Sequence, residues 1–262
     1  MNPTFSLAAP RAWRRVPAFA AAAIAFALVA GCAAGPNPRD PLEPFNRHVM
    51  EFNEGVDAVA LKPAAVVYRR AVPPLVRTGV SNFFGNLTDA WSFVNAALQF
   101  KLQAAAENFM RVNVNTFFGL GGVLDLACEL NIERHKEDFG QTLGRWGVPA
   151  GPYIVLPLLG PSTLRDTVAL PVDRYGDPIH YVTPWEPRYE LYAARAVDTR
   201  ANLLRLGNVF EQAALDKYSF QRDAYLQKRR ADIFDDEKRV DGNAGKEPKA
   251  DGEAAPGAAP KK

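Results

Sequence analysis

One cysteine near the N-terminus is placed for covalent modification. Cys32 directly follows the small residues Ala30 and Gly31, at the end of the segment LVAGC. Small side chains suit the narrow pocket of a signal peptidase, and the thiol after the cut can accept diacylglycerol. The amine freed by the cut can then take a further acyl chain. We therefore predict lipidation at Cys32; the alternative is an ordinary secretory signal that carries this cysteine by chance.

The segment before Cys32 has the pattern of a signal peptide. Arg11, Arg14 and Arg15 precede an apolar run from 17 to 30, which is shorter than the about 20 residues of a permanent membrane span. Two or three acyl chains anchor a protein durably, whereas one binds marginally. Ala33 rather than aspartate follows the cysteine, which resembles a signal for sorting to the outer membrane. We expect residues 1–31 to be the signal peptide and the mature chain to be lipid-anchored on the periplasmic side of that membrane.

Composition limits the remaining functions. The chain has 31 basic and 29 acidic residues, and removal of the three signal-peptide arginines leaves 28 basic residues against 29 acidic ones. A nearly neutral mature chain gives nucleic-acid binding no electrostatic support. Its length allows one domain of about 200 residues with tails.

Enzymatic and metal-binding motifs are missing from the sequence. Ser81 and Ser162 lack the glycines of a nucleophile elbow, and there is no H-E-x-x-H motif or P-loop. His48, His135 and His180 lie far apart and make no metal-ligand spacing, and Cys128 is expected to be a small core residue. We predict no enzyme activity, no cofactor and no metal.

Helical spacing dominates the mature chain. After a tether of residues 32–44, residues 45–60 read as a helix with one apolar stripe: Phe45, Val49, Phe52, Val56 and Val59. Residues 89–118 read as helical with a plausible cap at Asp89 and a second stripe: Trp91, Val94, Leu98, Leu102, Ala105 and Phe109. Residues 189–230 return to helical spacing. The domain is expected to cover residues 45–232 and to be mainly helical.

Glycine and proline interrupt these helices. Gly119-Leu120-Gly121-Gly122 predicts a turn between two apolar arms, and prolines make residues 140–161 an irregular apolar segment. Residues 233–262 are charged and poor in aromatic side chains, which predicts a disordered tail. The mature chain has no apolar run long enough to span a bilayer. Its short apolar elements would suit either a water-soluble helical core or a protein lying in a lipid layer.

Six ordered blocks, which together extend over residues 40–230, resemble one family. They are DPLEPFNR (40–47), GVSNFFGNL (79–87), NTFFGLGG (115–122), EDFGQTLG running on through WGV to GPY (137–153), LPLLGPSTLRD (156–166) and RDAYLQKRR (222–230). These blocks resemble the MlaA (VacJ) lipoprotein family. The resemblance implies an all-α, ring-like domain with short amphipathic helices and irregular Gly/Pro-rich segments, embedded in one membrane leaflet.

The resemblance also implies a function and partners. Such proteins remove misplaced phospholipids from the outer leaflet of the outer membrane through an amphipathic channel. They pass the lipids to a soluble periplasmic carrier, maintain lipid asymmetry and associate with trimeric porins. A membrane-anchored phospholipase or a structural or adhesion lipoprotein are the competing hypotheses.

Several residues are candidates for work in such a channel. Polar residues among the motif aromatics could line a headgroup route, and arginine matches phosphate through two parallel hydrogen bonds. The candidates are Asn46, Arg47, Arg111, Arg145 and Arg165, and the alternative for each arginine is an ordinary salt bridge. Gly119, Gly121 and Gly122 are the candidate mobile gate; the alternative is a static turn.

Overall fold

The computed structural model describes residues 40–213 and 216–244, so the predicted signal peptide, Cys32 and most of the tether lie outside the described residues. The first half of the described chain contains α2 (Glu43–Val56), η2 (Asp57–Leu61), α3 (Lys62–Ala71), α4 (Pro74–Leu98), α5 (Leu102–Phe117) and α6 (Leu126–Glu129). The second half contains α7 (Phe139–Arg145), β1 (Tyr153–Leu156), β2 (Gly160–Thr163), α8 (Leu164–Gly176), η3 (Pro178–Tyr181), α9 (Trp185–Ala213) and α10 (Lys217–Ala244).

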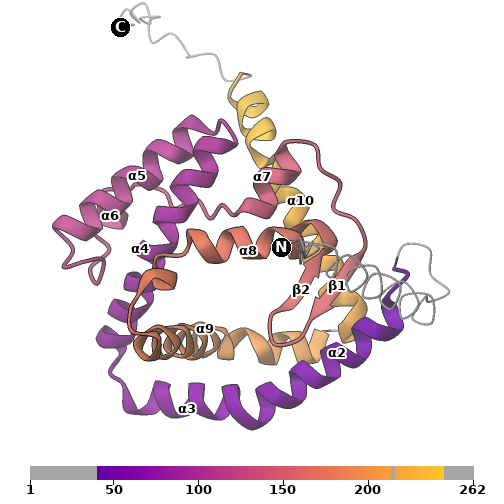
Figure 1. The fold of residues 1–262 in the computed structure, drawn as a ribbon. Helices are drawn as coiled ribbons and strands as arrows, with labels where there is room; N and C mark the ends of the chain where they lie inside the picture. The colour runs from indigo at the N-terminus through magenta and orange to yellow at the C-terminus, as the bar shows by residue number, and fades with distance from the viewer. Residues whose placement is uncertain (1–39, 214–215, 245–262) are drawn as a thin grey trace, which may run out of the picture.

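These elements form a ring of helices (Figure 1). In the view shown, α2 and α3 follow the lower edge, α4 the left side, α8 the upper side and the β1–β2 hairpin the right side. Helix α9 packs along α3, α5 packs along α4, and α7 packs against α8. The mainly helical ring expected from the sequence and the family resemblance is confirmed.

The first helix is longer than the sequence predicted. The backbone stays helical from Glu43 to Ala71, although Pro63 lies within this stretch. A π-helical turn at Asp57–Leu61 precedes the proline, and Lys62 donates its N–H to the Asp57 carbonyl, five residues back. Proline lacks an N–H and crowds the preceding turn, so the wider turn lets the chain pass Pro63 without leaving the helix.

Helix α2 is attached to the hairpin by two asparagines. Asn46 donates Nδ2 to the Tyr153 carbonyl at 3.1 Å and accepts the Val155 N–H at 2.8 Å. Asn53, about two turns further along α2, donates to the Leu156 carbonyl at 3.0 Å and accepts the Leu158 N–H at 2.7 Å. The two side-chain amides therefore form hydrogen bonds with backbone groups along one edge of β1, as a neighbouring strand would.

The hairpin itself was not foreseen in the irregular segment 140–161. Strands β1 and β2 pair antiparallel, with Tyr153 opposite Thr163 and Leu156 opposite Gly160. Leu158 and Gly160 have positive φ angles of 64° and 82°, which close the tight turn. Because the strands are short and have prolines on either side, they show little of the alternation between apolar and polar residues by which a strand is recognised in a sequence.

Two other expectations are wrong. Asp89 does not cap a helix, because it lies inside α4, and the predicted continuous stretch is two antiparallel helices separated at residues 99–101. Cys128 is exposed rather than a core residue. Helix α10 includes residues 233–244 at the start of the predicted tail, and residues 245–262 lie outside the described residues, so the tail stays a prediction.

The interior of the ring is unusually polar. Among the buried side chains of the described residues, polar and charged ones outnumber apolar ones, and most of the apolar ones are alanine. Helix α4 buries a stripe of polar residues at helical spacing: Asn86, Asp89, Ser92 and Asn95. Helix α5 faces it with Asn108, Arg111 and Asn115.

Arg111 joins several segments of the chain within this polar interior. Its Nε contacts the Asp89 carboxylate at 3.2 Å, its Nη2 contacts both Asp125 oxygens at 2.7 and 2.8 Å, and its Nη1 donates to the Ile132 carbonyl at 2.6 Å. Arg134 contacts the same two carboxylates. Arg111 is 2% exposed, so this one side chain joins α4, α5 and the following loop away from water.

Replacing Arg111 with alanine is expected to lower the free energy of unfolding by about 3–5 kcal/mol, because removal of one partner leaves buried charge and a buried carbonyl uncompensated. Urea titration followed by far-UV circular dichroism measures this change. Arg70→Ala, at an exposed position of α3, is the control and should change the value by less than about 0.5 kcal/mol. Equal effects of the two substitutions would contradict a central role for Arg111.

Candidate functional site

The glycine-rich turn after α5 is fixed at both ends. Gly122 donates its N–H to the Asn115 carbonyl at 2.8 Å, and Leu124 donates to the Gly119 carbonyl at 2.9 Å. A Cβ at Gly119 would stand 2.3 Å from the Leu124 carbonyl oxygen, and one at Gly122 would stand 2.6 Å from the Asn86 side chain. Both positions therefore require glycine for close approach.

The middle of this turn is different. Gly121 has a positive φ angle of 71°, and a Cβ there would meet nothing within 4 Å. Phe117, Phe118 and Leu120 around it are 76%, 74% and 75% exposed. The candidate gate is thus a tip of large apolar side chains on a turn that is attached to α4 but open on its outer side.

The two predicted apolar stripes are only partly exposed, since Ala105 is buried and Val49 packs against the buried cluster of Tyr153, Val155 and Tyr218. Phe45 and Phe52 of α2 and Val59 of η2 are exposed, whereas Asn46 of α2 is buried. On the second stripe, Leu102 and Phe109 are exposed, whereas Asn108 is buried on the same helix. Exposure continues on α8, η3 and α9 with Val168, Tyr175, Tyr181, Trp185 and Tyr189. Many large apolar side chains are thus exposed around the ring.

Among the candidate arginines, Arg47 is half-exposed and forms ion pairs. It contacts Asp216 through two nitrogens, at 3.0 and 2.7 Å, and Glu43 at 2.9 Å. The hydrogen bonds from Arg47 hold the pKa of the Asp216 carboxyl well below its usual range. Because both partners are partly exposed, the pair contributes little to stability and leaves the guanidinium in reach of another anion.

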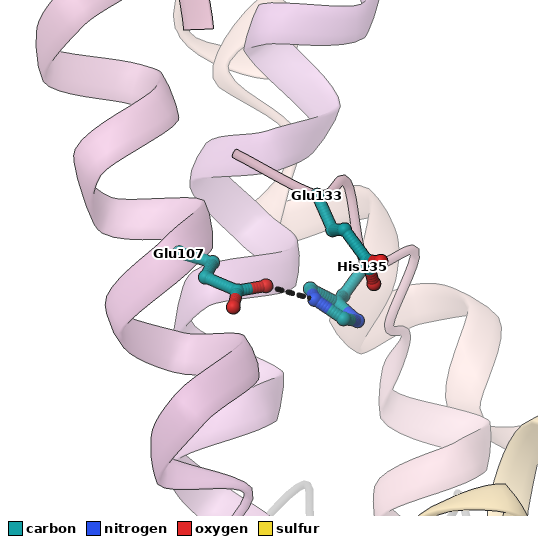
Figure 2. Close-up of side chains that lie close together, drawn as sticks. All are labelled: Glu107, Glu133 and His135. Carbon is teal, nitrogen blue, oxygen red and sulfur yellow. Dashed lines mark hydrogen bonds and ion pairs between the residues drawn. The ribbon is translucent and has the colours of Figure 1, made fainter. Parts of the chain in front are cut away.

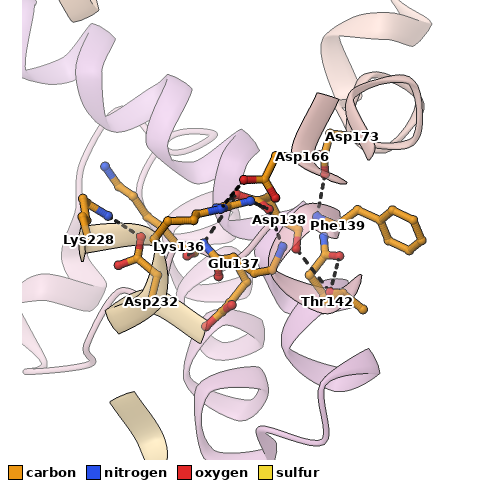
Figure 3. A network of polar contacts seen from close by, with 12 residues as sticks. Lys136, Glu137, Asp138, Phe139, Thr142, Asp166, Asp173, Lys228 and Asp232 are labelled. Atoms are coloured by element: carbon orange, nitrogen blue, oxygen red, sulfur yellow. Dashed lines mark hydrogen bonds and ion pairs between the residues drawn. The ribbon is translucent and has the colours of Figure 1, made fainter. Parts of the chain in front are cut away.

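Arg165 belongs to a second buried charge cluster, which joins α7, α8 and α10. It donates Nε and Nη2 to Asp166 at 3.0 and 2.9 Å. Arg229 binds Asp138 through two nitrogens at 2.6 Å each and also reaches Asp166 at 2.9 Å. Asp138 and Asp166 consequently lie side by side between the helices (Figure 3).

Electrostatics and backbone geometry both favour this cluster. Burial opposes ionisation of Asp166, but hydrogen bonds and charge from Arg229 outweigh it and hold the pKa of Asp166 below its ordinary value. Asp138 also caps α7 by accepting the Gln141 N–H at 2.8 Å. A Cβ at Gly140 would stand 2.5 Å from Asp166 Oδ1, so the glycine of the EDFG block allows the charged groups to meet.

The structure does not bring the five candidate polar residues together. Asn46 attaches α2 to β1, Arg111 and Arg165 lie in two separate buried ion clusters, Arg47 lies near Asp216, and Arg145 lies in the last turn of α7. Sequence reasoning missed Asn53, Asn108 and Arg229. The polar stripes of α4 and α5, at the same helical spacing as the apolar ones, were the signal that could have revealed the buried face.

No helix in the described ranges 40–213 and 216–244 is long and apolar enough to cross a bilayer.

The chain is similar to characterised proteins over most of its length. Residues 38–232 match the model of the family described as MlaA lipoprotein. The "Intermembrane phospholipid transport system lipoprotein MlaA" of Escherichia coli K12 is 36% identical over 216 residues, covering 79% of this chain and 85% of the relative. The protein of the same name from Haemophilus influenzae is 38% identical over 195 residues, covering 72% and 76%.

A solved structure agrees with the sequence match. A chain from work described as "Structural basis for maintenance of bacterial outer membrane lipid asymmetry" superposes with a TM-score of 0.66 at 36% identity. The match covers 74% of this chain and 98% of the solved one. Together, these similarities show that the chain belongs to the MlaA lipoprotein family.

Proposed function

We propose that this protein is an outer-membrane lipoprotein that moves misplaced phospholipids from the outer leaflet toward the periplasm and so maintains lipid asymmetry. Membership of the MlaA family supports the proposal, as does the relative in Escherichia coli named for intermembrane phospholipid transport. A lipid chain on Cys32, on the periplasmic side, would hold the mature protein at the membrane.

The observation that carries the proposal is the inverted polarity of the ring. Large apolar side chains of α2 and α5, such as Phe52 and Phe109, are exposed, whereas the polar stripes of α4 and α5 are buried against each other. Such a body can lie in one leaflet with its exposed side chains among acyl chains, without a membrane-spanning helix.

The candidate residues take different parts in this proposal. Arg47 and Arg145 are proposed contacts for lipid phosphate, since arginine matches phosphate geometry. The contacts of Asn46, Arg111 and Arg165 support a role for these three in holding the ring in shape. Gly119, Gly121 and Gly122 are the proposed gate.

The proposed partners are phospholipids, trimeric porins and a soluble periplasmic carrier. A ring held in the inner leaflet needs a route to lipids of the outer leaflet. The wall of a porin passes through both leaflets, so a ring bound to that wall would have such a route. A released phospholipid needs an acceptor, because its acyl chains cannot cross the periplasm unshielded.

Deleting the gene is expected to raise the amount of phospholipid exposed on the cell surface. Expression of this chain in the deletion strain should return that amount to the level of the parent strain. Surface labelling of phosphatidylethanolamine in intact cells measures the change. Unchanged surface phospholipid would contradict the proposal and favour a structural or adhesion lipoprotein. Release of fatty acid or lysolipid by the purified protein would instead favour a phospholipase.

Two glycines of the gate, Gly121 and Gly122, should respond differently to alanine. Gly122→Ala is expected to disturb lipid clearance strongly, because its methyl group would collide with Asn86 and force the turn away from α4. Gly121→Ala meets no neighbour and is expected to have a smaller effect, from its positive φ angle alone. Detergent and chelator resistance at matched protein level measures clearance, and normal resistance in both variants would contradict a gate here.

Two exposed tryptophans should touch acyl chains. The mature chain has Trp91, Trp146 and Trp185, of which Trp146 and Trp185 are exposed, whereas Trp91 is half-buried and donates Nε1 to Asp173 at 2.8 Å. In vesicles of brominated phospholipid, we expect fluorescence quenching that survives Trp91→Phe and is mostly lost in Trp146→Phe/Trp185→Phe. Equal quenching in the double variant, or none in the parent protein, would contradict contact of these side chains with lipid.

A further inference from the structure

An extended segment after α6 is fixed along α5. The buried Asn108 donates Nδ2 to the His135 carbonyl at 2.9 Å and accepts the His135 N–H at 3.2 Å. Arg111, one turn further along α5, donates to the Ile132 carbonyl at 2.6 Å. Two attachments to one helix hold the backbone between residues 132 and 135 in a set position.

Side chains of this segment alternate between two directions. Arg134 points to the buried carboxylates of Asp89 and Asp125. Glu133 and His135, on either side of it, gather near Glu107 of α5 (Figure 2). Because Glu107 is the chain neighbour of Asn108, the attachment of His135 also sets the distance from its ring to Glu107.

Three potential ligands therefore meet at one place. One ligand atom from each of Glu107, Glu133 and His135 lies within 4.8 Å of the other two. His135 Nε2 contacts Glu107 Oε2 at 2.5 Å, and Gln103 donates Nε2 to the other Glu107 oxygen at 2.9 Å. The His135 and Glu107 side chains are partly buried, at 16% and 24% exposure.

Although the spacing of the histidines along the sequence predicted no metal site, we infer that Glu107, Glu133 and His135 form a binding site for a divalent transition-metal ion, with Zn²⁺ the best match. One imidazole and two carboxylates are ligands that Zn²⁺ takes at about 2.0–2.2 Å, with water in an open fourth position. Magnesium and calcium prefer oxygen ligands alone, so the imidazole disfavours them.

The ion's role would be structural. It enters when the flexible Glu107 side chain moves off His135, since the two atoms now in contact must separate to share a metal. Once bound, the ion would connect the segment after α6 to α5 beside the Asn108 attachment. This site is independent of the proposed transport function.

Calorimetric titration of ZnCl₂ into the chelator-treated mature protein tests the site. We expect one ion per chain, a raised Tm with Zn²⁺, and no competition from excess Mg²⁺. Glu133→Gln and Glu107→Gln should each weaken binding at least tenfold, as should His135→Asn. Because Glu133 is exposed, Glu133→Gln should leave the Tm of the metal-free protein unchanged.

His48→Ala is the matched control. His48 lies on α2 with a single carboxylate nearby, Glu51 at 3.6 Å, and both side chains are highly exposed. This variant should bind Zn²⁺ like the parent protein. Absence of saturable binding, unchanged affinity in Glu133→Gln, or an equal loss in His48→Ala would overturn the proposed site.

Discussion

The buried polar groups of this ring must find their partners in one another, and the rest of the structure follows from this constraint. An unpaired polar group inside a protein costs far more than a paired one contributes, so each buried arginine or asparagine determines which segments can be neighbours. Arg111 sets α5 against α4 and the loop that follows. Asn46 and Asn53 set α2 against β1, and Arg229 joins α10 to α7 and α8.

The same constraint explains the outer surface. Where helices meet through asparagine, aspartate and arginine, their large apolar residues are left on the opposite face. In water, that arrangement would leave Phe52, Phe109 and Trp185 without burial, and the main driving force for folding would be lost. In the function proposed above, acyl chains would supply the missing apolar phase, while the polar contacts inside give the ring its specific shape.

The sequence could predict the helices but not which way they face. Spacing alone identified the stripes of α2 and α5, and glycine identified the turn at 119–122. A stripe of Phe, Val and Leu normally marks a core, yet here the parallel stripe of Asn86, Asp89, Ser92 and Asn95 is the buried one. Residues far apart in sequence provide its partners, as Arg134 does for Asp89, and spacing along one helix carries no information about them. The hairpin was missed for a related reason, since its outer edge pairs with asparagine side chains rather than another strand.

Charge pairing also limits where the ring can move. Breaking the Arg111 or Arg229 clusters would expose several ions at once, so rigid connections hold α4 with α5 and α7 with α8 and α10. The turn at 119–122 is attached to this frame through Asn82, which donates Nδ2 to the Val123 carbonyl, and through the backbone of Gly119, but Leu120 at its tip is exposed and a Cβ at Gly121 would meet nothing within 4 Å. For the proposed gate, motion that admits a lipid would therefore be cheapest at this tip, where large apolar side chains could shift among acyl chains without breaking an ion pair. A gate of this kind would change the edge of the ring and leave its buried polar contacts intact.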